Sequence, residues 1–401
     1  MDAIAGPASE NLGPWDERRT VGVACGAHML HDGFTDTIYI LLPIWQNEFG
    51  LGYAALGLMK TVFSGALAGF QIPSGMLGER FGPAPVLAVG TAVVGLGYCL
   101  AGTSTGLAML ITALFLGGVG ASTQHPLASS LIAHAFSGAR SRKAIGTYNF
   151  TGDLGKMAMP AVASLLFLVL SWRYTLIVLG SLGLIAAVAI FIFTPRTGNV
   201  HSEQAKSAVT GSGPAHSSAF CLLLVVGMID NLTRSAFLTF LPFALKDKGA
   251  SLQIIGTALA LVFAGGAAGK FVCTFIGVRI GTVATVWLTE SATALGIFTI
   301  LVLPLAPSLA LLPLMGIALN GTSSVLYGSV PELVEPKKRT RAFSIFYTAT
   351  IGSGALAPTV YGVLGDATGI PVAMIVAAAI VLLTLPLTWM LRPALRAIAA
   401  A

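Results

Sequence analysis

The sequence predicts an all-α membrane protein of twelve transmembrane helices, arranged as two six-helix repeats. Of its 401 residues, 55% are hydrophobic and 9% are charged, and the mean hydropathy is +0.85. A soluble domain carries about 25% charged residues, so most of the outer surface of this chain is expected to face lipid. Apolar stretches of about 20 residues, long enough to span a bilayer, recur along the chain. They are continuous rather than alternating, which favours helices over the strands of a barrel.

Glycines, prolines and charge clusters divide the chain into twelve predicted spans. These are residues 21–48, 53–79, 84–104, 107–136, 143–170, 172–194, 217–246, 251–278, 283–304, 307–335, 341–368 and 370–392. The polar segment 195–218 separates the sixth span from the seventh, so we expect two six-helix domains, 1–194 and 219–401, joined by this linker. Residues 1–20 lack the apolar core of a cleavable signal peptide. The first span is therefore expected to act as its own insertion signal.

Lysine and arginine are distributed unequally between alternate loops. The termini and one set of loops hold 15 of the 22 basic residues, and the opposite loops hold Arg173, Lys246 and Lys248. The positive-inside rule then places both termini and the linker in the cytoplasm. The formal charge of +6 thus reflects topology rather than nucleic-acid binding. The four cysteines stand singly in apolar segments, without metal-binding spacings, and are interpreted as packing residues.

The two halves match each other at a constant offset of 199 residues. The matching pairs are Pro43 and Pro242, Gly50 and Gly249, Gly57 and Gly256, Arg80 and Arg279, Gly82 and Gly281, Gly117 and Gly316, Arg142 and Arg341, Tyr148 and Tyr347, and Gly155 and Gly354. Two parallel six-helix repeats, related by an axis along the membrane normal, resemble the organisation of major facilitator transporters. That resemblance implies that the first and fourth helix of each half line a central substrate path.

The loop between the second and third spans also resembles this superfamily. Residues 75–82 read Gly-Met-Leu-Gly-Glu-Arg-Phe-Gly, similar to the family motif G-x-L-x-D-R-x-G. We predict a gating loop whose key residues are Gly75, Glu79, Arg80 and Gly82. An acid at a helix end can pair with arginine or cap a neighbouring helix N-terminus, so Glu79 could latch one access state. The alternative is a tight turn between two helices.

Several segments resemble the fosmidomycin-resistance family of bacterial drug exporters. They are His31–Gly33, Leu41–Pro43, Gly117–Gly120, His125–Pro126, and Gly152–Gly155 with Pro160. The last of these is also similar to the glycine- and proline-rich motif of proton-driven antiporters. The resemblance implies a drug-resistance exporter in the cell inner membrane.

The first span carries His28, His31, Asp32 and Asp36. The spacing of four residues puts His28, Asp32 and Asp36 on one helix face, with His31 at its edge. Ionisable groups within a membrane are functional hypotheses by default, and histidine exchanges protons near neutral pH. These four residues are the predicted proton-coupling site. The alternative for either acid is a structural ion pair with a cation on another helix.

Two further spans pair opposite charges at helical spacing. Asp230 and Arg234 lie four residues apart, and Asp153 and Lys156 lie three apart. Both pairs are predicted local ion pairs. Arg234 is also the predicted substrate-binding cation, because the repeat sets it at the depth of Thr35. There it would face the acidic stripe of the first span and attract an anion.

Lys270 has no local partner, so it is a second candidate for substrate binding, together with Gln124, His125, Asn320 and Tyr327. For His125 the alternative is a core histidine with satisfied hydrogen bonds. Glu290 is expected to pack against a neighbour outside the cavity.

Histidines and methionines of the first half could also indicate a metal site. His28, His31, Asp32, His125, Met157 and Met159 would suit copper if they met, but they form no compact motif. We predict no metal and no cofactor.

The leading functional hypothesis is a secondary active transporter: a monomeric, proton-coupled antiporter that exports a small anionic or amphipathic compound. The alternative is a proton-coupled importer of an organic anion or metabolite, because the same charges serve either direction. A transition-metal transporter and a non-transporting membrane sensor are two further hypotheses. No nucleophile–base set or phosphate loop indicates an enzyme, and the expected partners are a small-molecule substrate, protons and the lipid bilayer, not nucleic acid.

Overall fold

The computed structural model describes residues 13–136, 138–195, 218–334 and 339–399. These residues form fourteen α-helices and one short 3-10 turn, with no strand. The elements are α1 Pro14–Phe49, α2 Tyr53–Phe81, α3 Pro83–Gly102, α4 Leu107–Ala121, α5 Gln124–Ala135, α6 Gly138–Leu166, α7 Trp172–Phe193, α9 Ser218–Asp247, α10 Leu252–Ile280, α11 Thr282–Val302, α12 Leu305–Ser329, η1 Val330–Glu332, α13 Arg339–Thr368, α14 Ile370–Val381 and α15 Thr384–Ala399. The predicted linker lies outside the described residues, except for its first and last residue.

The prediction of twelve helical spans is confirmed, with two spans interrupted. The fourth span breaks between α4 and α5, and the twelfth breaks between α14 and α15. At the first break, the hydroxyls of Ser122 and Thr123 donate to the carbonyls of Val119 and Gly120, at 2.6 and 2.9 Å. Such bonds compete with the regular helical ladder. The break places Gln124 at the start of α5.

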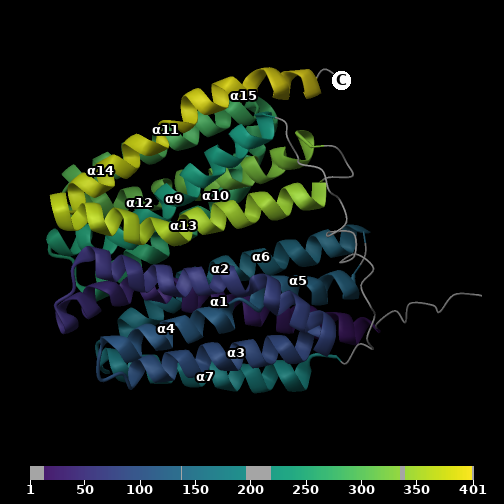
Figure 1. Cartoon of the computed structure of the whole chain (residues 1–401), viewed down its shortest axis with the longest axis vertical. Coiled ribbons are helices and arrows are strands. Elements are labelled where there is room, and N and C mark those ends of the chain that lie inside the picture. Colours follow the sequence, from purple (N-terminus) through teal and green to yellow (C-terminus); the bar gives the residue numbers. More distant parts are fainter. Residues whose placement is uncertain (1–12, 137, 196–217, 335–338, 400–401) are drawn as a thin grey trace, which may run out of the picture.

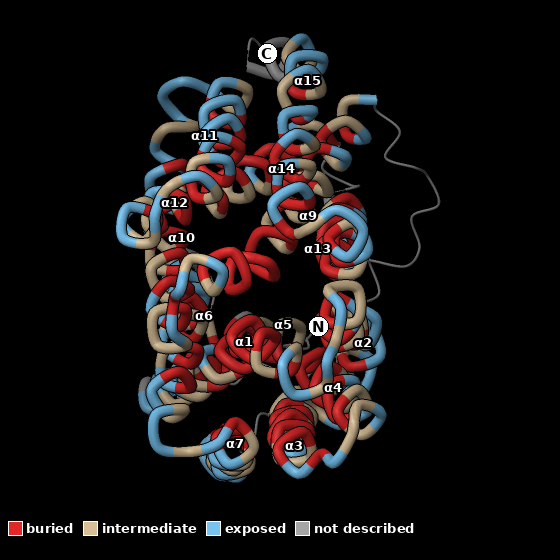
Figure 2. The backbone as a smooth tube through the Cα atoms, turned by 90° about the vertical axis from the view of Figure 1, so that its left-hand side faces the viewer, coloured by how far each residue is buried: buried red, intermediate tan, exposed pale blue. Residues whose placement is uncertain are grey.

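Length and apolar composition qualify nine of the described helical segments to cross a membrane; α1, α6 and α13 are not among them. Figure 2 shows exposed residues along the outer perimeter of the bundle and buried residues inside it. Many of the exposed side chains are large and apolar, among them Val89, Tyr174, Phe275 and Val278. An apolar perimeter is what lipid contact requires.

The repeat is visible in the backbone. Gly50 and its counterpart Gly249 have φ values of +61° and +84°, and Gly82 and Gly281 have +90° and +84°. Each of them ends or follows a helix. Residues with side chains rarely adopt this left-handed region, so glycine is favoured at all four turns. The 199-residue offset therefore relates equivalent turns of the two halves.

Helices α1 to α7 form one bundle and α9 to α15 the other (Figure 1). We call the end at which α7 finishes and α9 begins the linker end, on the right in Figure 1, and the opposite end the far end. One apolar core crosses both bundles at the far end, with Trp45 and Leu41 packed in the same cluster as Phe240 and Phe243.

At the linker end the core is divided. Leu87, Leu127 and Tyr148 belong to a cluster within the first bundle, and Leu223 and Phe346 belong to a separate cluster within the second. The bundles are thus packed together at the far end and are separate at the linker end, as Figure 1 also shows.

Polar contacts also join the bundles at the far end. The carboxylate of Asp366, on α13, accepts hydrogen bonds from the backbone N–H groups of Tyr53 and Ala54, at 2.6 and 2.9 Å. It therefore caps the N-terminus of α2, where the helix dipole favours a negative charge. Lys246 donates to the Asn47 side chain at 3.0 Å. Together these contacts keep the far end closed.

The predicted gating loop lies at the linker end. Glu79 and Arg80 are exposed, and the Arg80 guanidinium lies over the Phe81 ring at 5.2 Å. Within the described ranges, Glu79 forms no ion pair and caps no helix, because the bundles are separate here. Glu79 lies near the C-terminal end of α2. A carboxylate cap is formed at the N-terminal end of this helix instead, by Asp366 of α13.

Candidate functional site

Glycines allow α1 and α6 to pack in close contact. A side chain at Gly155 would collide with the carbonyl of Met29, and one at Gly152 would collide with His28 and Asp32. Small residues at helix interfaces are a general means of bringing helices together in membranes. Here they bring the polar face of α1 against α6.

Asp32 is the centre of a charged cluster in the first bundle. Its Oδ2 lies 3.2 Å from His28 Nε2 and 3.3 Å from Lys156 Nζ, and its Oδ1 lies 4.0 Å from His125 Nε2. His28 Nδ1 lies 2.7 Å from the carbonyl oxygen of Tyr148. Since a carbonyl only accepts, Nδ1 carries the hydrogen of the neutral ring, and Nε2 is the nitrogen that faces Asp32. The cluster is therefore suited to hold a proton.

The other predicted residues of α1 do not join this cluster. His31 points to α3, where its Nε2 lies 2.9 Å from the hydroxyl of Thr91. Asp36 is buried and forms no ion pair within 4 Å among the described residues. Within the predicted proton-coupling site, the structure places His28 and Asp32 in direct contact, whereas His31, at the edge of the stripe, contacts Thr91 of α3.

The second bundle carries the matching cation. Arg234 Nη2 lies 3.5 Å from Asp230 Oδ2, so the predicted ion pair is confirmed. Its Nη1 donates to the Asn320 side chain at 3.4 Å, which places Asn320 beside Arg234. The Tyr327 hydroxyl lies 3.3 Å from that of Thr350.

Lys156 of the first bundle and Arg234 of the second are within electrostatic range of each other, and Tyr347 of α13 is within range of both. The side chain of Lys156 is 32% exposed and that of Arg234 is 19% exposed. The sequence predicts that Arg234 faces the acids of α1 directly. The structure pairs Asp32 with Lys156 instead, so each of the two partly exposed cations already holds a carboxylate.

The ion pair expected between Asp153 and Lys156 is not formed. Both carboxylate oxygens of Asp153 lie 2.7 Å from Nζ of Lys270, on α10 of the other bundle. Side chains three residues apart on a helix diverge by about 60°, which lets Lys156 reach α1 while Asp153 reaches α10. Lys270, expected as a cation without a partner, is thus half of a contact between the bundles.

Exchanging these two charges should test that contact. Asp153→Asn and Lys270→Met should each lower stability by about 1 kcal/mol, because Lys270 is partly exposed and such pairs are screened. The exchange Asp153→Lys with Lys270→Asp should recover most of the loss. Thermal unfolding of the purified protein measures this in a double-mutant cycle. Additive losses with no recovery would contradict the pairing.

Gln124 and His125 occupy different surroundings at the start of α5. Gln124 is buried, and its Nε2 lies 3.5 Å from the Tyr148 hydroxyl. His125 is partly exposed at the edge of the Asp32 cluster.

Together with His28 and Asp32, His125 could in principle hold a metal ion, since the ligand atoms lie within 4.8 Å of one another. However, the Lys156 ammonium already neutralises Asp32 and would repel a metal cation. The donor set therefore suits a proton better than a metal.

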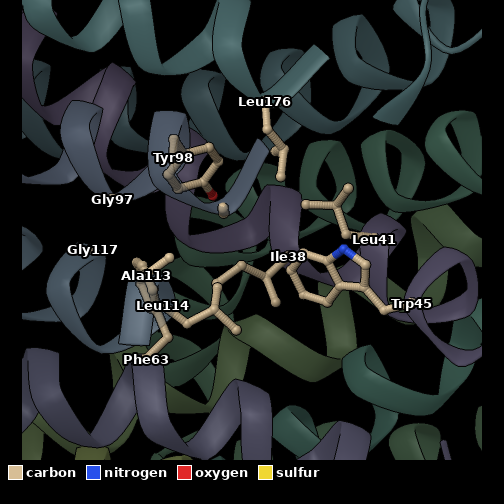
Figure 3. Close-up of a pocket in the computed structure, with 11 residues that line it drawn as sticks. Ile38, Leu41, Trp45, Phe63, Gly97, Tyr98, Ala113, Leu114, Gly117 and Leu176 are labelled. Carbon is tan, nitrogen blue, oxygen red and sulfur yellow. The ribbon is translucent and has the colours of Figure 1, made fainter. Parts of the chain in front are cut away.

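A small pocket lies inside the first bundle (Figure 3). Its lining is almost wholly apolar and includes Ile38, Leu41, Trp45, Phe63, Tyr98, Leu114 and Leu176. The same side chains belong to the apolar core, and the Tyr98 hydroxyl donates to the backbone carbonyl of Phe34. We therefore interpret the pocket as a packing feature.

Two residues of this arrangement are missed or misplaced by sequence reasoning. Lys156 is expected to pair within its own helix but pairs with Asp32 of α1. Asp366 is not singled out at all. Its only signal is an acid near the end of a span, opposite the N-terminus of another helix. Nothing in the sequence shows which helix ends are neighbours.

Two six-helix bundles with opposed charges between them define a multi-pass membrane transporter. The chain belongs to the Major Facilitator Superfamily, whose family model matches residues 24–226 and 223–398. This family accounts for the fold and indicates transport rather than catalysis.

Curated relatives match most of the chain. It is similar to the probable sulfoacetate transporter SauU of Cupriavidus necator, at 24% identity over 377 residues that cover 87% of each chain. It is also similar to the probable L-galactonate transporter of Escherichia coli, at 23% identity over 360 residues, covering 80% of this chain and 77% of that one.

The fold also matches a solved structure. This is a bacterial homologue of the human lysosomal transporter Spinster in its inward-facing, unoccupied conformation, with a TM-score of 0.80. The identity is 14%, and the match covers 96% of this chain and 99% of the other. At this identity the likeness shows the fold alone.

Proposed function

We propose that this protein takes up a small organic anion together with protons. The observation that carries the proposal is that Lys156 and Arg234, two partly exposed cations from opposite bundles, are within electrostatic range of each other. Arginine recognises carboxylates and similar oxyanions in a forked geometry. Sulfoacetate and L-galactonate, named for the two relatives, both carry a carboxylate. We therefore assign a carboxylate-bearing substrate to the space between the two cations.

The direction of coupling follows from what each cation already binds. Lys156 is paired with Asp32 and Arg234 with Asp230. An anion that takes either cation must compete with that carboxylate. Protonation of the carboxylate removes the competitor and frees the cation. Proton and anion therefore favour each other's binding, and the effect is reciprocal by linkage. This cooperation is the basis of symport.

Proton-coupled antiport with export is the second candidate. It is favoured by the close packing of Gly152 and Gly155 on α1 and by Pro160 within α6, the features that resemble antiporters and fosmidomycin-resistance exporters. In antiport, substrate and proton would exclude each other from the site. The direction of proton movement relative to the substrate therefore separates the two candidates.

We further propose the placement in the cell. Counting basic residues assigns the linker end to the cytoplasm, so the separation of the bundles at that end corresponds to an inward-facing state. Domains 1–194 and 219–401, joined by linker 195–218, would move as two bodies within a monomer. The two relatives named above are bacterial, which supports a bacterial inner membrane.

The proposal is tested in proteoliposomes that contain a pH-sensitive dye. Sulfoacetate or L-galactonate is added outside, and a cationic drug serves as the comparison. Symport predicts that an anion acidifies the lumen, and that the isosteric variant Asp32→Asn loses most of this signal. Glu48→Gln, at the exposed far end of α1, should keep it.

Three outcomes would overturn symport of an anion. Alkalinisation of the lumen would indicate antiport instead. Uptake without any change in pH would exclude proton coupling, and a response to the cationic drug alone would exclude an anionic substrate.

A further inference from the structure

Two buried acids touch each other in the second bundle. Asp230 on α9 is 4% exposed and Glu290 on α11 is 1% exposed, and their side chains are within hydrogen-bonding contact. Two ionised carboxylates in such contact repel each other, and burial penalises the charge further. A stable contact therefore needs one hydrogen between them.

The repeat shows what the equivalent positions do in the first bundle. Asp230 corresponds to His31 and Glu290 to Thr91 at the offset of 199. His31 Nε2 and Thr91 Oγ1 form a hydrogen bond of 2.9 Å. Asp230 and Glu290 occupy these same two positions in the second half, where their side chains also interact. In the first half the residue types supply a donor and an acceptor, whereas in the second half both are acids.

The surroundings of Glu290 leave one oxygen unsatisfied. Its Oε1 is sealed from solvent and has no hydrogen-bond donor in the described part of the chain. The hydroxyl of Thr322 also lies against Glu290, but it donates to Thr289 at 2.7 Å. A proton on the Glu290 carboxyl would satisfy this oxygen by turning it into a donor.

Other charged groups around the pair are few. From α9, Arg234 contacts Asp230 at 3.5 Å. From α12, Tyr327 interacts with Asp230 and Arg234. Helix α14 carries no ionisable residue. Lys270 of α10 is bonded to Asp153, and Arg392 of α15 lies over Trp389. Arg234 is therefore the one described cation in contact with the pair.

We propose that Asp230 and Glu290 share one proton, which is bound and released in step with the anion at Arg234. This inference rests on the proton coupling proposed above and adds a second proton-binding site to that of Asp32. While Arg234 contacts Asp230, the guanidinium stabilises the ionised pair. When an anion draws Arg234 away, that stabilisation is lost and the pair holds its proton more tightly. The arginine thus connects the occupancy of the two sites.

The central test compares Glu290→Gln with Glu48→Gln, which changes an exposed acid. Glutamine mimics the permanently protonated acid. Glu290→Gln should still exchange sulfoacetate or L-galactonate between the two sides of the membrane, because exchange needs no net release of protons. It should lose at least 10-fold in accumulation driven by a pH gradient, whereas Glu48→Gln should lose neither activity.

An infrared measurement keeps the test independent of transport. Wild type should show the infrared absorption of a buried protonated carboxyl, and this absorption should be absent in Glu290→Gln. In wild type, anion binding should move the titration of this absorption to higher pH. A Glu290→Gln variant that accumulates anion like wild type, or a wild-type spectrum without this absorption, would overturn the inference. Failure of wild type to acidify the lumen would instead reject the proposed symport itself.

Discussion

Replacing Arg234 by glutamine is expected to reduce anion uptake by about 100-fold. Hydrogen bonds to a charged group contribute about 1.5–3 kcal/mol each, and about 1.4 kcal/mol corresponds to a factor of ten in affinity. Arg234 is bordered by Asp230 and Asn320, at 3.5 and 3.4 Å, and a forked contact to a carboxylate would supply two such bonds. Transport assays at several anion concentrations should show the loss mainly as weaker binding.

Stability has to be separated from binding in this variant. The substitution leaves Asp230 without its cation, and breaking a buried pair can cost about 3–5 kcal/mol. The double variant Arg234→Gln with Asp230→Asn removes both charges and should recover thermal stability without recovering uptake. Arg392→Gln, a cation stacked on Trp389 outside the site, is the control. Uptake by the double variant at the wild-type level would show that Arg234 does not bind substrate.

A leucine at Gly57 is expected to hold the far end open and to abolish transport. Any side chain at this position of α2 would collide with the backbone carbonyl of Pro358 in α13. Overpacking costs about 1–3 kcal/mol even where neighbouring side chains can adjust, and a backbone carbonyl adjusts less. The equilibrium should therefore shift by at least about 10-fold away from the state in which the far end is closed.

Spin labels at positions 47 and 246 would report this shift directly, in a chain whose four native cysteines are replaced by serine. The distance between the labels should be short in the parent and longer in Gly57→Leu. Gly65→Leu is the matched control, since Gly65 lies on the same helix and a side chain there would meet nothing within 4 Å. Equal distances in all three proteins would refute the role of Gly57.

Sequence reasoning recovers the fold because hydropathy and turn glycines report on single helices. The constant internal offset then relates each helix to its counterpart in the other half. Gly50, Gly82 and their counterparts behave alike since the same turn needs the same residue. One of the two ion pairs expected within a single helix, that of Asp230 and Arg234, is also recovered. The domain boundaries, the orientation in the membrane and the roles of the site residues stay predictions.

Partners on different helices could not be predicted. Asp153 prefers Lys270 of another bundle to Lys156 of its own helix, and this choice depends on which helix faces which. The same holds for Glu290, whose position beside Asp230 follows from the packing of α9 and α11. The repeat relates the contact of His31 and Thr91 to that of Asp230 and Glu290. One of these two contacts must be known before the repeat can predict the other.

The bond between Asn47 and Lys246 at the far end has a geometric consequence. The two residues are 199 positions apart, so they are copies of the same site in an ancestral half-length chain. Two copies related by twofold rotation can touch only where the rotation axis itself passes. This hydrogen bond therefore marks the midline of the molecule at its far end. Any cargo that crosses this end along the midline must part the two residues, so their separation would be an obligatory step of every turnover.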